Sequence, residues 1–187
     1  MGYLSGAGLI IVQAISGLIL GLFVLRVLLP LAGARFRNPI CQMIYQATNP
    51  LLVPLTRIVP NWRAISMAGV MVAWLLATLI AAMILWLVGT TMDLLHVLFY
   101  ATATLIHFVL SLYFWTILIG ALMSMFAPDR SHPLVELIAA LSNPILRPFR
   151  RLPPHFPGID LSPLWVLLLI RLIQYSLSYI GFTGLLS

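Results

Sequence analysis

The stretch "NPILRPFRRLPP", residues 143–154, repeats an earlier stretch, "NPLLVPLTRIVP", residues 49–60. Aligned without a gap, the two stretches lie 94 residues apart, which is the difference between 143 and 49. The matched pairs are Asn49 with Asn143, Pro50 with Pro144, Pro54 with Pro148, and Arg57 with Arg151. A match that holds at a fixed offset predicts a duplicated structural unit.

The chain around these two stretches is unusually apolar. Of its 187 residues, 62% are hydrophobic and 7% are charged, whereas a soluble domain carries about 25% charged residues. Membrane-crossing helices need roughly 20 apolar residues. Four stretches are long enough, namely 8–31, 67–89, 97–126 and 163–186. We therefore predict an all-α membrane protein with four transmembrane helices.

Each proline-containing stretch lies between two of these spans. The duplicated unit is therefore a span, an interfacial helix and a second span. We predict two such tandem repeats, residues 1–92 and residues 93–187. Because each unit holds an even number of spans, both copies enter the membrane in the same orientation. A pseudo-twofold axis along the membrane normal should then relate them.

The segment after the first span predicts a short amphipathic helix that lies in the membrane interface. Asn38 is a favourable cap, and Pro39 is a favourable first helical residue. Apolar residues recur at helical spacing in both copies, at positions 40, 43, 44 and 47 and at positions 134, 137, 138 and 141. Because a residue before proline avoids the helical region, we expect each helix to end at its Asn-Pro pair. Pro54 or Pro148 should then kink the turn that follows.

The formal charge is +6, and all ten basic residues are arginine. Outside the spans, the arginines lie in residues 32–66 and 127–162. Basic connections stay in the cytoplasm, so we predict both connections at the cytoplasmic face and both termini on the opposite side. In a membrane protein this charge favours anionic lipids as partners rather than nucleic acid. The predicted contact residues are Arg57, Arg147, Arg150 and Arg151.

Asp160, Ser162 and Pro163 precede the apolar part of the fourth span. Ser162 and Pro163 form a favourable helix start, with a capping side chain followed by proline. A carboxylate such as Asp160 is favoured near a helix N-terminus, and we expect it to pair with a nearby arginine. A gating or binding role for Asp160 is the alternative interpretation.

Arg171 lies inside the fourth predicted span, about 14 Å from its start at 1.5 Å per residue. An arginine at that depth costs ~3 kcal/mol. Gln174 lies one turn further on, and His107 lies in the third span. One interpretation is polar contact between helices with snorkelling of long side chains, which also accounts for Arg26. The other is a polar path, or a site for a lipid, an ion or a partner.

Sequence patterns of common enzyme classes are missing, with no glycine-rich phosphate loop, no C-x-x-C and no H-E-x-x-H. The four histidines fall in different segments. We therefore expect no enzymatic activity, no cofactor and no metal. The single cysteine, Cys41, cannot form an intrachain disulfide and is expected to be buried among apolar neighbours.

Residues 143–163, "NPILRPFRRLPPHFPGIDLSP", resemble the signature of the YggT family of small membrane proteins. The first copy departs from this signature, because "AISMAG" at 64–69 replaces Gly-Ile-Asp-Leu-Ser-Pro, and Thr56 stands where the second copy has Arg150. The resemblance implies a bacterial inner-membrane protein linked to osmotic and potassium stress tolerance, with no established catalytic activity. It also assigns any role of the acidic element to the second copy.

These features favour a non-enzymatic scaffold, assembly or osmotic-stress homeostasis factor, whose basic segments contact anionic lipid or a protein partner. The alternative is a channel or transporter component for ions, which would use the polar stripe around Arg171 and His107. Four spans are few for a pore, so this alternative requires an oligomer. The expected partners are membrane lipids and either another membrane protein or further copies of the chain.

Overall fold

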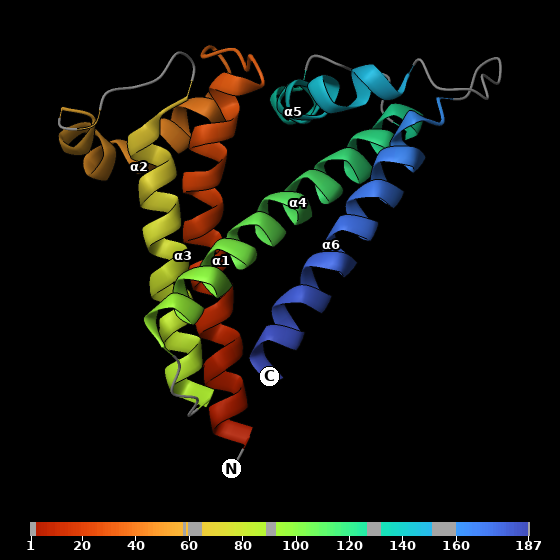
Figure 1. The fold of residues 1–187 in the computed structure, drawn as a ribbon. Coiled ribbons are helices and arrows are strands. Elements are labelled where there is room, and N and C mark those ends of the chain that lie inside the picture. Colours follow the sequence, from red (N-terminus) through yellow and green to blue (C-terminus); the bar gives the residue numbers. More distant parts are fainter. Residues whose placement is uncertain are drawn as a thin grey trace. The chain divides into compact units, whose positions relative to one another are not determined.

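The structure is a computed structural model that describes residues 3–57, 59, 65–88, 93–126, 132–150 and 160–186. Within these residues the chain forms six helices (Figure 1). They are α1 (Tyr3–Leu31), α2 (Pro39–Thr56), α3 (Met67–Val88), α4 (Leu94–Phe126), α5 (Pro133–Phe149) and α6 (Ser162–Leu186). The prediction of an all-α protein is confirmed.

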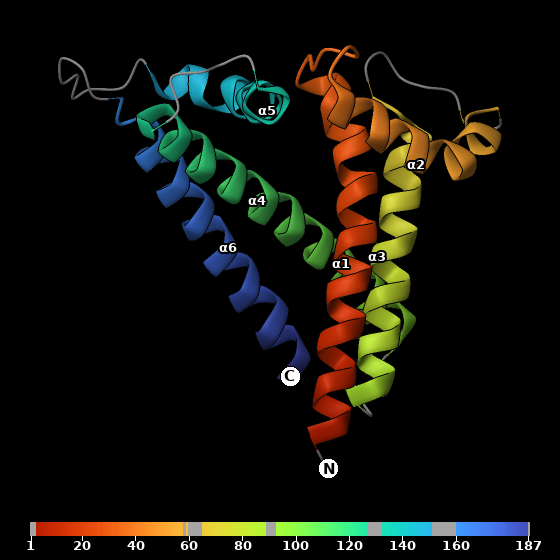
Figure 2. The same cartoon turned by 180° about the vertical axis from the view of Figure 1, so that it is seen from behind.

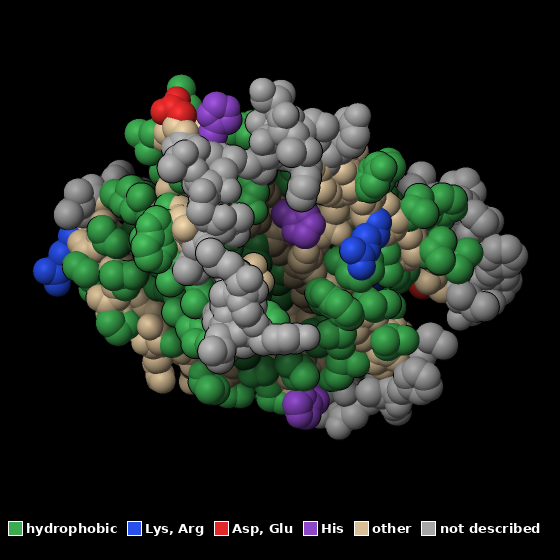
Figure 3. Space-filling view, turned by 90° about the horizontal axis from the view of Figure 1, so that it is seen from below, with side chains coloured by type: hydrophobic (Ala, Val, Ile, Leu, Met, Phe, Trp, Pro, Cys, Tyr) green, Lys and Arg blue, Asp and Glu red, His purple; other side chains and the backbone are tan. Residues whose placement is uncertain are grey.

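Three helices are long and apolar enough to cross a membrane, over Ile10–Leu31, Met67–Trp86 and Leu94–Ser124. A shorter apolar stretch, Ser162–Ser178, lies in α6. Large apolar side chains on these helices face outward, as Leu18 does with 73% of its surface exposed. Figure 3 shows a face on which hydrophobic side chains predominate over charged ones. Such surfaces need lipid around them, so the chain is a membrane protein with several candidate spans.

The helices α2 and α5 do not end at Asn49-Pro50 and Asn143-Pro144, so that prediction is wrong. Each continues through both of its prolines, to Thr56 in α2 and to Phe149 in α5. A proline removes one N–H donor and leaves the carbonyl four residues earlier without its helical partner. The four prolines are exposed, so these carbonyls, which lie on the same face, can bond to water or lipid headgroups instead.

Packing divides the chain into two compact units. Unit 1 comprises Met1–Val27 and Ala47–Ile106, and unit 2 comprises Leu28–Gln46 and His107–Ser187. These units differ from the predicted repeats, because residues 28–46 of the first repeat belong by packing to unit 2. The repeat boundary between residues 92 and 93 rests on sequence and stays a prediction.

In unit 1, α1 and α3 lie side by side in both views (Figures 1 and 2). Their close approach depends on Gly69, because a Cβ atom there would lie 2.8 Å from Val27 Cγ2. The start of α4 also contacts α3, where Trp74 Nε1 donates a hydrogen bond to Thr102 Oγ1 at 3.0 Å.

In unit 2, the second half of α4 runs beside α6, and α5 lies across their ends (Figures 1 and 2). Buried apolar side chains join the three helices, with Ile117 from α4, Leu146 from α5, and Val166 and Ile170 from α6. This core fixes α5 at the end of the α4–α6 pair, where a membrane interface would lie.

Burial repeats at the offset that the sequence predicts. Positions 94 residues apart are buried in both copies, and the exposed fraction is below 9% at each. The pairs are Phe23 with Ile117, Thr48 with Ser142, Leu52 with Leu146, and Val72 with Val166. The match is partial, because Ala81 is 1% exposed and its equivalent Tyr175 is 73% exposed.

Candidate functional site

Four polar residues of the second stretch and the acidic element meet in one hydrogen-bond network, which we call the clasp: Asn143, Arg150, Asp160 and Ser162. Asp160 accepts from the Ser162 backbone N–H at 2.9 Å, from the Ser162 hydroxyl, and from Arg150 Nε at 3.2 Å. Arg150 Nη2 donates to Asn143 Oδ1 at 3.4 Å. The clasp thus ties the C-terminal end of α5 to the first turn of α6.

The electrostatics of Asp160 favour its charged form. Burial, the largest single influence, raises the pKa of the carboxyl group. Hydrogen bonds from the Ser162 hydroxyl and backbone, together with the hydrogen bond and charge of Arg150, outweigh it and hold the pKa below the usual value. Helix capping and pairing with an arginine are the contacts that the sequence predicts for Asp160. Pro163 follows in the first turn of α6.

The first copy holds its asparagine with a different arginine. Asn49 Oδ1 accepts from Arg26 Nη2 of α1 at 3.4 Å. Thr56, which stands in the place of Arg150, donates its hydroxyl to the Val53 carbonyl of its own helix at 2.9 Å. The sequence predicts only snorkelling for Arg26, and the contact with Asn49 was missed. The sequence held one indication of this contact. Thr56 stands where the second copy has Arg150, so Asn49 has no equivalent of that donor and can accept from another arginine.

The two amphipathic helices start with side-chain caps at equivalent positions. Asn38 Oδ1 accepts from the Ile40 backbone N–H at 3.0 Å, and His132 Nδ1 accepts from that of Leu134 at 3.2 Å. The cap at Asn38 confirms the prediction for the first helix. The offset of 94 assigns the same role to His132, which sequence reasoning overlooked.

Within unit 2 the cap of α2 also contacts the start of α5. Asn38 is 3% exposed, and its Nδ2 donates to the Pro133 carbonyl at 2.7 Å and to Glu136 Oε2 at 3.5 Å. Arg35 Nη1 lies 3.7 Å from Glu136 Oε1. Sequence reasoning did not connect these residues, because contacts between segments so far apart in the chain leave no periodic pattern.

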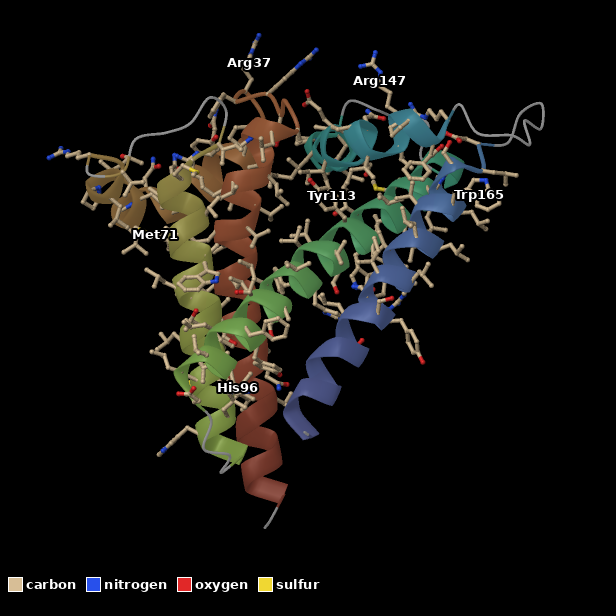
Figure 4. The ribbon with its side chains drawn as sticks, viewed as in Figure 1. Arg37, Met71, His96, Tyr113, Arg147 and Trp165 are labelled. Atoms are coloured by element: carbon tan, nitrogen blue, oxygen red, sulfur yellow. The ribbon has the colours of Figure 1, made fainter. Side chains whose placement is uncertain are left out.

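The predicted lipid-contacting arginines have different surroundings. Arg57 and Arg147 are exposed at the ends of α2 and α5, whereas Arg150 belongs to the clasp. Figure 4 shows Arg147 extending from the side of α5 that faces away from α4 and α6. The side chain of Arg37, which precedes α2 in unit 2, points to the top of the same view. Arg151 lies outside the described residues, as do Gly158 and Ile159 of the acidic element.

Polar side chains inside the predicted fourth span contact α4. Gln174 is 5% exposed, and its Nε2 donates to Ser111 Oγ at 2.8 Å. The Arg171 guanidinium lies 4.1 Å from the centroid of the Phe114 ring, which is cation–π geometry. Among the described residues nothing donates to Gln174 Oε1. His107 is exposed on α4, so these contacts join Arg171 and Gln174 to α4 without it.

The described ranges contain no group of three or more histidine, cysteine, aspartate or glutamate side chains that could hold a metal ion. Burial, followed by the nearby charge of Glu136, raises the pKa of the Cys41 thiol above its usual value. That thiol is 2% exposed, so it has the character of a small buried apolar side chain.

Comparison with known proteins places the chain among bacterial relatives. A CCB3/YggT family model matches residues 6–89 and 99–181. An uncharacterized protein of Pseudomonas aeruginosa is 36% identical over 173 residues, which are 91% of this chain and 88% of the relative. The uncharacterized protein YggT of Escherichia coli is 31% identical over 151 residues, 80% of this chain and 78% of the relative. No solved structure matches the chain.

Proposed function

Because the chain belongs to the CCB3/YggT family, we propose that it is a non-enzymatic protein of the bacterial inner membrane. It acts as a scaffold, an assembly factor or an osmotic-stress homeostasis factor. Its amphipathic helices α2 and α5 contact anionic lipid or a protein partner through their arginines. The observation that carries this proposal is the exposure of Arg57 and Arg147 at the ends of two helices whose opposite faces are buried.

The proposal includes four membrane crossings, with α6 as the fourth. This helix runs without interruption over 25 residues. At 1.5 Å per residue it is about 37 Å long, more than the ~30 Å thickness of the hydrocarbon core. Four crossings put α2 and α5 on one side of the membrane. That side is the cytoplasm, because arginines concentrate in the connections that hold these helices.

The arginines outside the clasp are free of its hydrogen bonds and can attract an anionic surface. Each basic residue near an anionic surface contributes about 1 kcal/mol. Arg37, Arg57 and Arg147 are exposed, so together they would contribute roughly 3 kcal/mol of attraction to such a surface. An acidic protein partner would be attracted in the same way.

The test is purification of the full chain in mild detergent, with measurement of the proteins and anionic lipids that come with it. The test variant is Arg37→Gln, Arg57→Gln and Arg147→Gln together, which leaves the clasp intact. We expect it to lose most of the recovered partner or anionic lipid. The matched control changes the same three residues to Lys, keeps the charge and should keep recovery. Equal recovery from wild type and the Gln variant would reject the proposal.

The second candidate is a channel or transporter component that works as an oligomer. The specific observation in its favour is the intramembrane cluster, in which Gln174 Oε1 is buried without a donor among the described residues and Arg171 is exposed. A neighbouring copy could supply the missing partners. Under this candidate, liposomes with the wild type pass ions and those with Arg171→Leu do not. Wild-type liposomes that pass no ions would exclude it.

A further inference from the structure

Unit 2 contains a groove of about 1600 Å³. Its walls come from four parts of the unit, namely the segment 33–41, the end of α4, the helix α5 and the start of α6. Drug-sized ligands occupy pockets of roughly 300–1,000 Å³. The groove is therefore large enough for a longer amphipathic molecule.

The rim of the groove is polar and electrically balanced. Two ion pairs line it, Arg35 with Glu136 at 3.7 Å and Arg150 with Asp160 at 3.2 Å. The side chains of Asn38 and Asn143 lie beside these pairs as further hydrogen-bonding groups. An occupant that carried only negative charge would face two carboxylates here. One that carried both a positive and a negative group would match the rim.

Apolar side chains also line the groove. They come from α4, α5 and α6 and include Ile117, Ala121, Leu146, Leu164 and Leu167. Ile117 lies nine residues before the end of α4 at Phe126, which corresponds to roughly 13 Å along the helix. The lining thus combines polar side chains near the ends of α5 with apolar side chains along α4 and α6.

Gly120 marks a close approach of α4 and α5 in the wall of the groove. The equivalent residue of the first copy is Arg26, 94 positions earlier, and its side chain extends to Asn49. Gly120 has no side chain and lines the groove. A Cβ atom there would lie 3.0 Å from Ile138 Cγ2 and 3.5 Å from Ser142 Oγ. The glycine therefore allows α5 to pack directly against α4 in the second copy.

We propose that the groove binds one glycerophospholipid with a zwitterionic, primary-amine headgroup, of the phosphatidylethanolamine type. Its phosphate accepts hydrogen bonds from Arg150, and its ammonium donates to Asp160. The other ion pair, at Glu136, lies near the opposite end of α5, about 21 Å away along the helix. A carboxylate has about four acceptor sites and an ammonium has three donors, so the existing ion pairs can persist. One acyl chain lies along the apolar interior. A choline headgroup lacks N–H donors, and a glycerol headgroup lacks the positive charge.

This site goes beyond the proposed function, in which the exposed arginines attract anionic lipid from the surrounding membrane. The two ideas predict different lipids and depend on different residues. A discrete lipid in the groove depends on its apolar interior and on the pair of Arg150 and Asp160. Attraction at the surface depends on Arg37, Arg57 and Arg147.

The test is native mass spectrometry of the purified, delipidated full chain, with phosphatidylethanolamine, phosphatidylglycerol or phosphatidylcholine added at equal concentration. We expect the wild type to retain one phosphatidylethanolamine per chain, about tenfold more often than either other lipid. Ala121→Phe fills the interior and should reduce this retention about tenfold. The matched control is Ala82→Phe, on an exposed position of α3, which should retain the lipid as the wild type does.

Several outcomes would overturn the site. One is that the wild type retains the three lipids equally. Another is that a folded Ala121→Phe chain retains phosphatidylethanolamine as often as the wild type does. A third is that the variant with Arg37, Arg57 and Arg147 changed to Gln loses the bound phosphatidylethanolamine. Thermal unfolding and gel-filtration profiles show whether Ala121→Phe folds. If it does not, Leu164→Trp serves as the filling variant, because Leu164 lines the groove and is 59% exposed. Retention by a folded Leu164→Trp chain at the wild-type level also contradicts the proposal.

Discussion

The helices α2 and α5 are two versions of one element, and they differ in how their shared asparagine is held. Both begin with a side-chain cap and continue through two exposed prolines. In α2, Asn49 accepts from Arg26 of the preceding span. In α5, Asn143 accepts from Arg150 of the same helix, which also binds Asp160 before α6.

In both copies an arginine donates to the asparagine, although the two arginines lie at different positions of the repeat. Where the arginine lies on the span, as in the first copy, it occupies the space between span and amphipathic helix. Where it lies at the end of α5, it is available to Asp160, and the span has Gly120 instead. The second copy thereby gains the clasp, which the first copy lacks.

The arginine exchange can be tested directly in the first copy. Arg26→Gly should lower the free energy of unfolding by about 1.5–3 kcal/mol, because it removes a hydrogen bond that involves a charged group and places a glycine inside α1, which alone costs about 1 kcal/mol. Adding Thr56→Arg, which copies the arrangement of Arg150, should recover part of this loss. The measurement is the thermal unfolding midpoint in detergent. If Thr56→Arg recovers nothing in the Arg26→Gly background, the two arginines are not interchangeable.

The next effect concerns the glycine at the α1–α3 contact. Gly69→Ala would place Cβ 2.8 Å from Val27 Cγ2, and overpacking of this kind costs about 1–3 kcal/mol. Gly17→Ala is the matched control, since nothing lies within 4 Å of a Cβ there. Thermal unfolding of the two variants should show destabilisation only for Gly69→Ala. A drop of equal size in both would remove the steric explanation.

The clasp should contribute less, because its ion pair is half exposed on both sides. A double-mutant cycle of Arg150→Gln and Asp160→Asn should give a coupling of about 0.2–1 kcal/mol at neutral pH. No such coupling should exist between Asn49 and Asp160. Additive effects of Arg150→Gln and Asp160→Asn would show that the clasp does not act as a unit.

The clasp also has a defined pH dependence. The folded pKa of Asp160 lies below its usual value, so its stabilising contribution is complete above the unfolded pKa of about 3.9. The contribution is lost as the pH falls through the lowered folded pKa. The stability difference between wild type and Asp160→Asn should therefore be constant from about pH 7 to pH 5 and should close in more acidic solution. A difference that closes above pH 5 would contradict this assignment.

The smallest effect is expected at the exposed pair of Arg35 and Glu136. The Arg35 side chain is 81% exposed and lies 3.7 Å from the carboxylate, and such pairs contribute about 0–1 kcal/mol. Arg35→Gln should therefore leave the unfolding midpoint nearly unchanged. A large drop would mean that the link between the α2 cap and α5 depends on this charge rather than on Asn38.

Periodicity and length were enough to predict the helices, because apolar stretches longer than a bilayer crossing have few alternatives. The same holds for the cap at Asn38 and the capping contacts of Asp160, since both depend on neighbouring residues. The helix ends were predicted wrongly at the Asn-Pro pairs. The rule that a residue before proline avoids the helical region considers only local geometry. It does not take into account that the carbonyls freed by the prolines lie on an exposed face, where water can bond to them.

Contacts between distant segments could not be predicted from one sequence. Arg26 reaches Asn49 across 23 positions, and Asn38 reaches Glu136 across 98. The offset of 94 gave one indication, because Arg26 aligns with Gly120 and Thr56 aligns with Arg150. Each copy therefore has an arginine at a position where the other has none. The groove combines residues 33–41 with α4, α5 and α6, and no motif predicts that these segments meet.

We propose that α2 and α5 lie on the cytoplasmic side of a chain that crosses the membrane four times. A membrane-impermeant maleimide can test this on the full chain, in a Cys41→Ser background with one cysteine added at a time. We predict that His96→Cys and Ser187→Cys label from outside the cell, and Arg147→Cys only in inside-out vesicles. Labelling of Arg147→Cys from outside, or of Ser187→Cys only in inside-out vesicles, would contradict this topology.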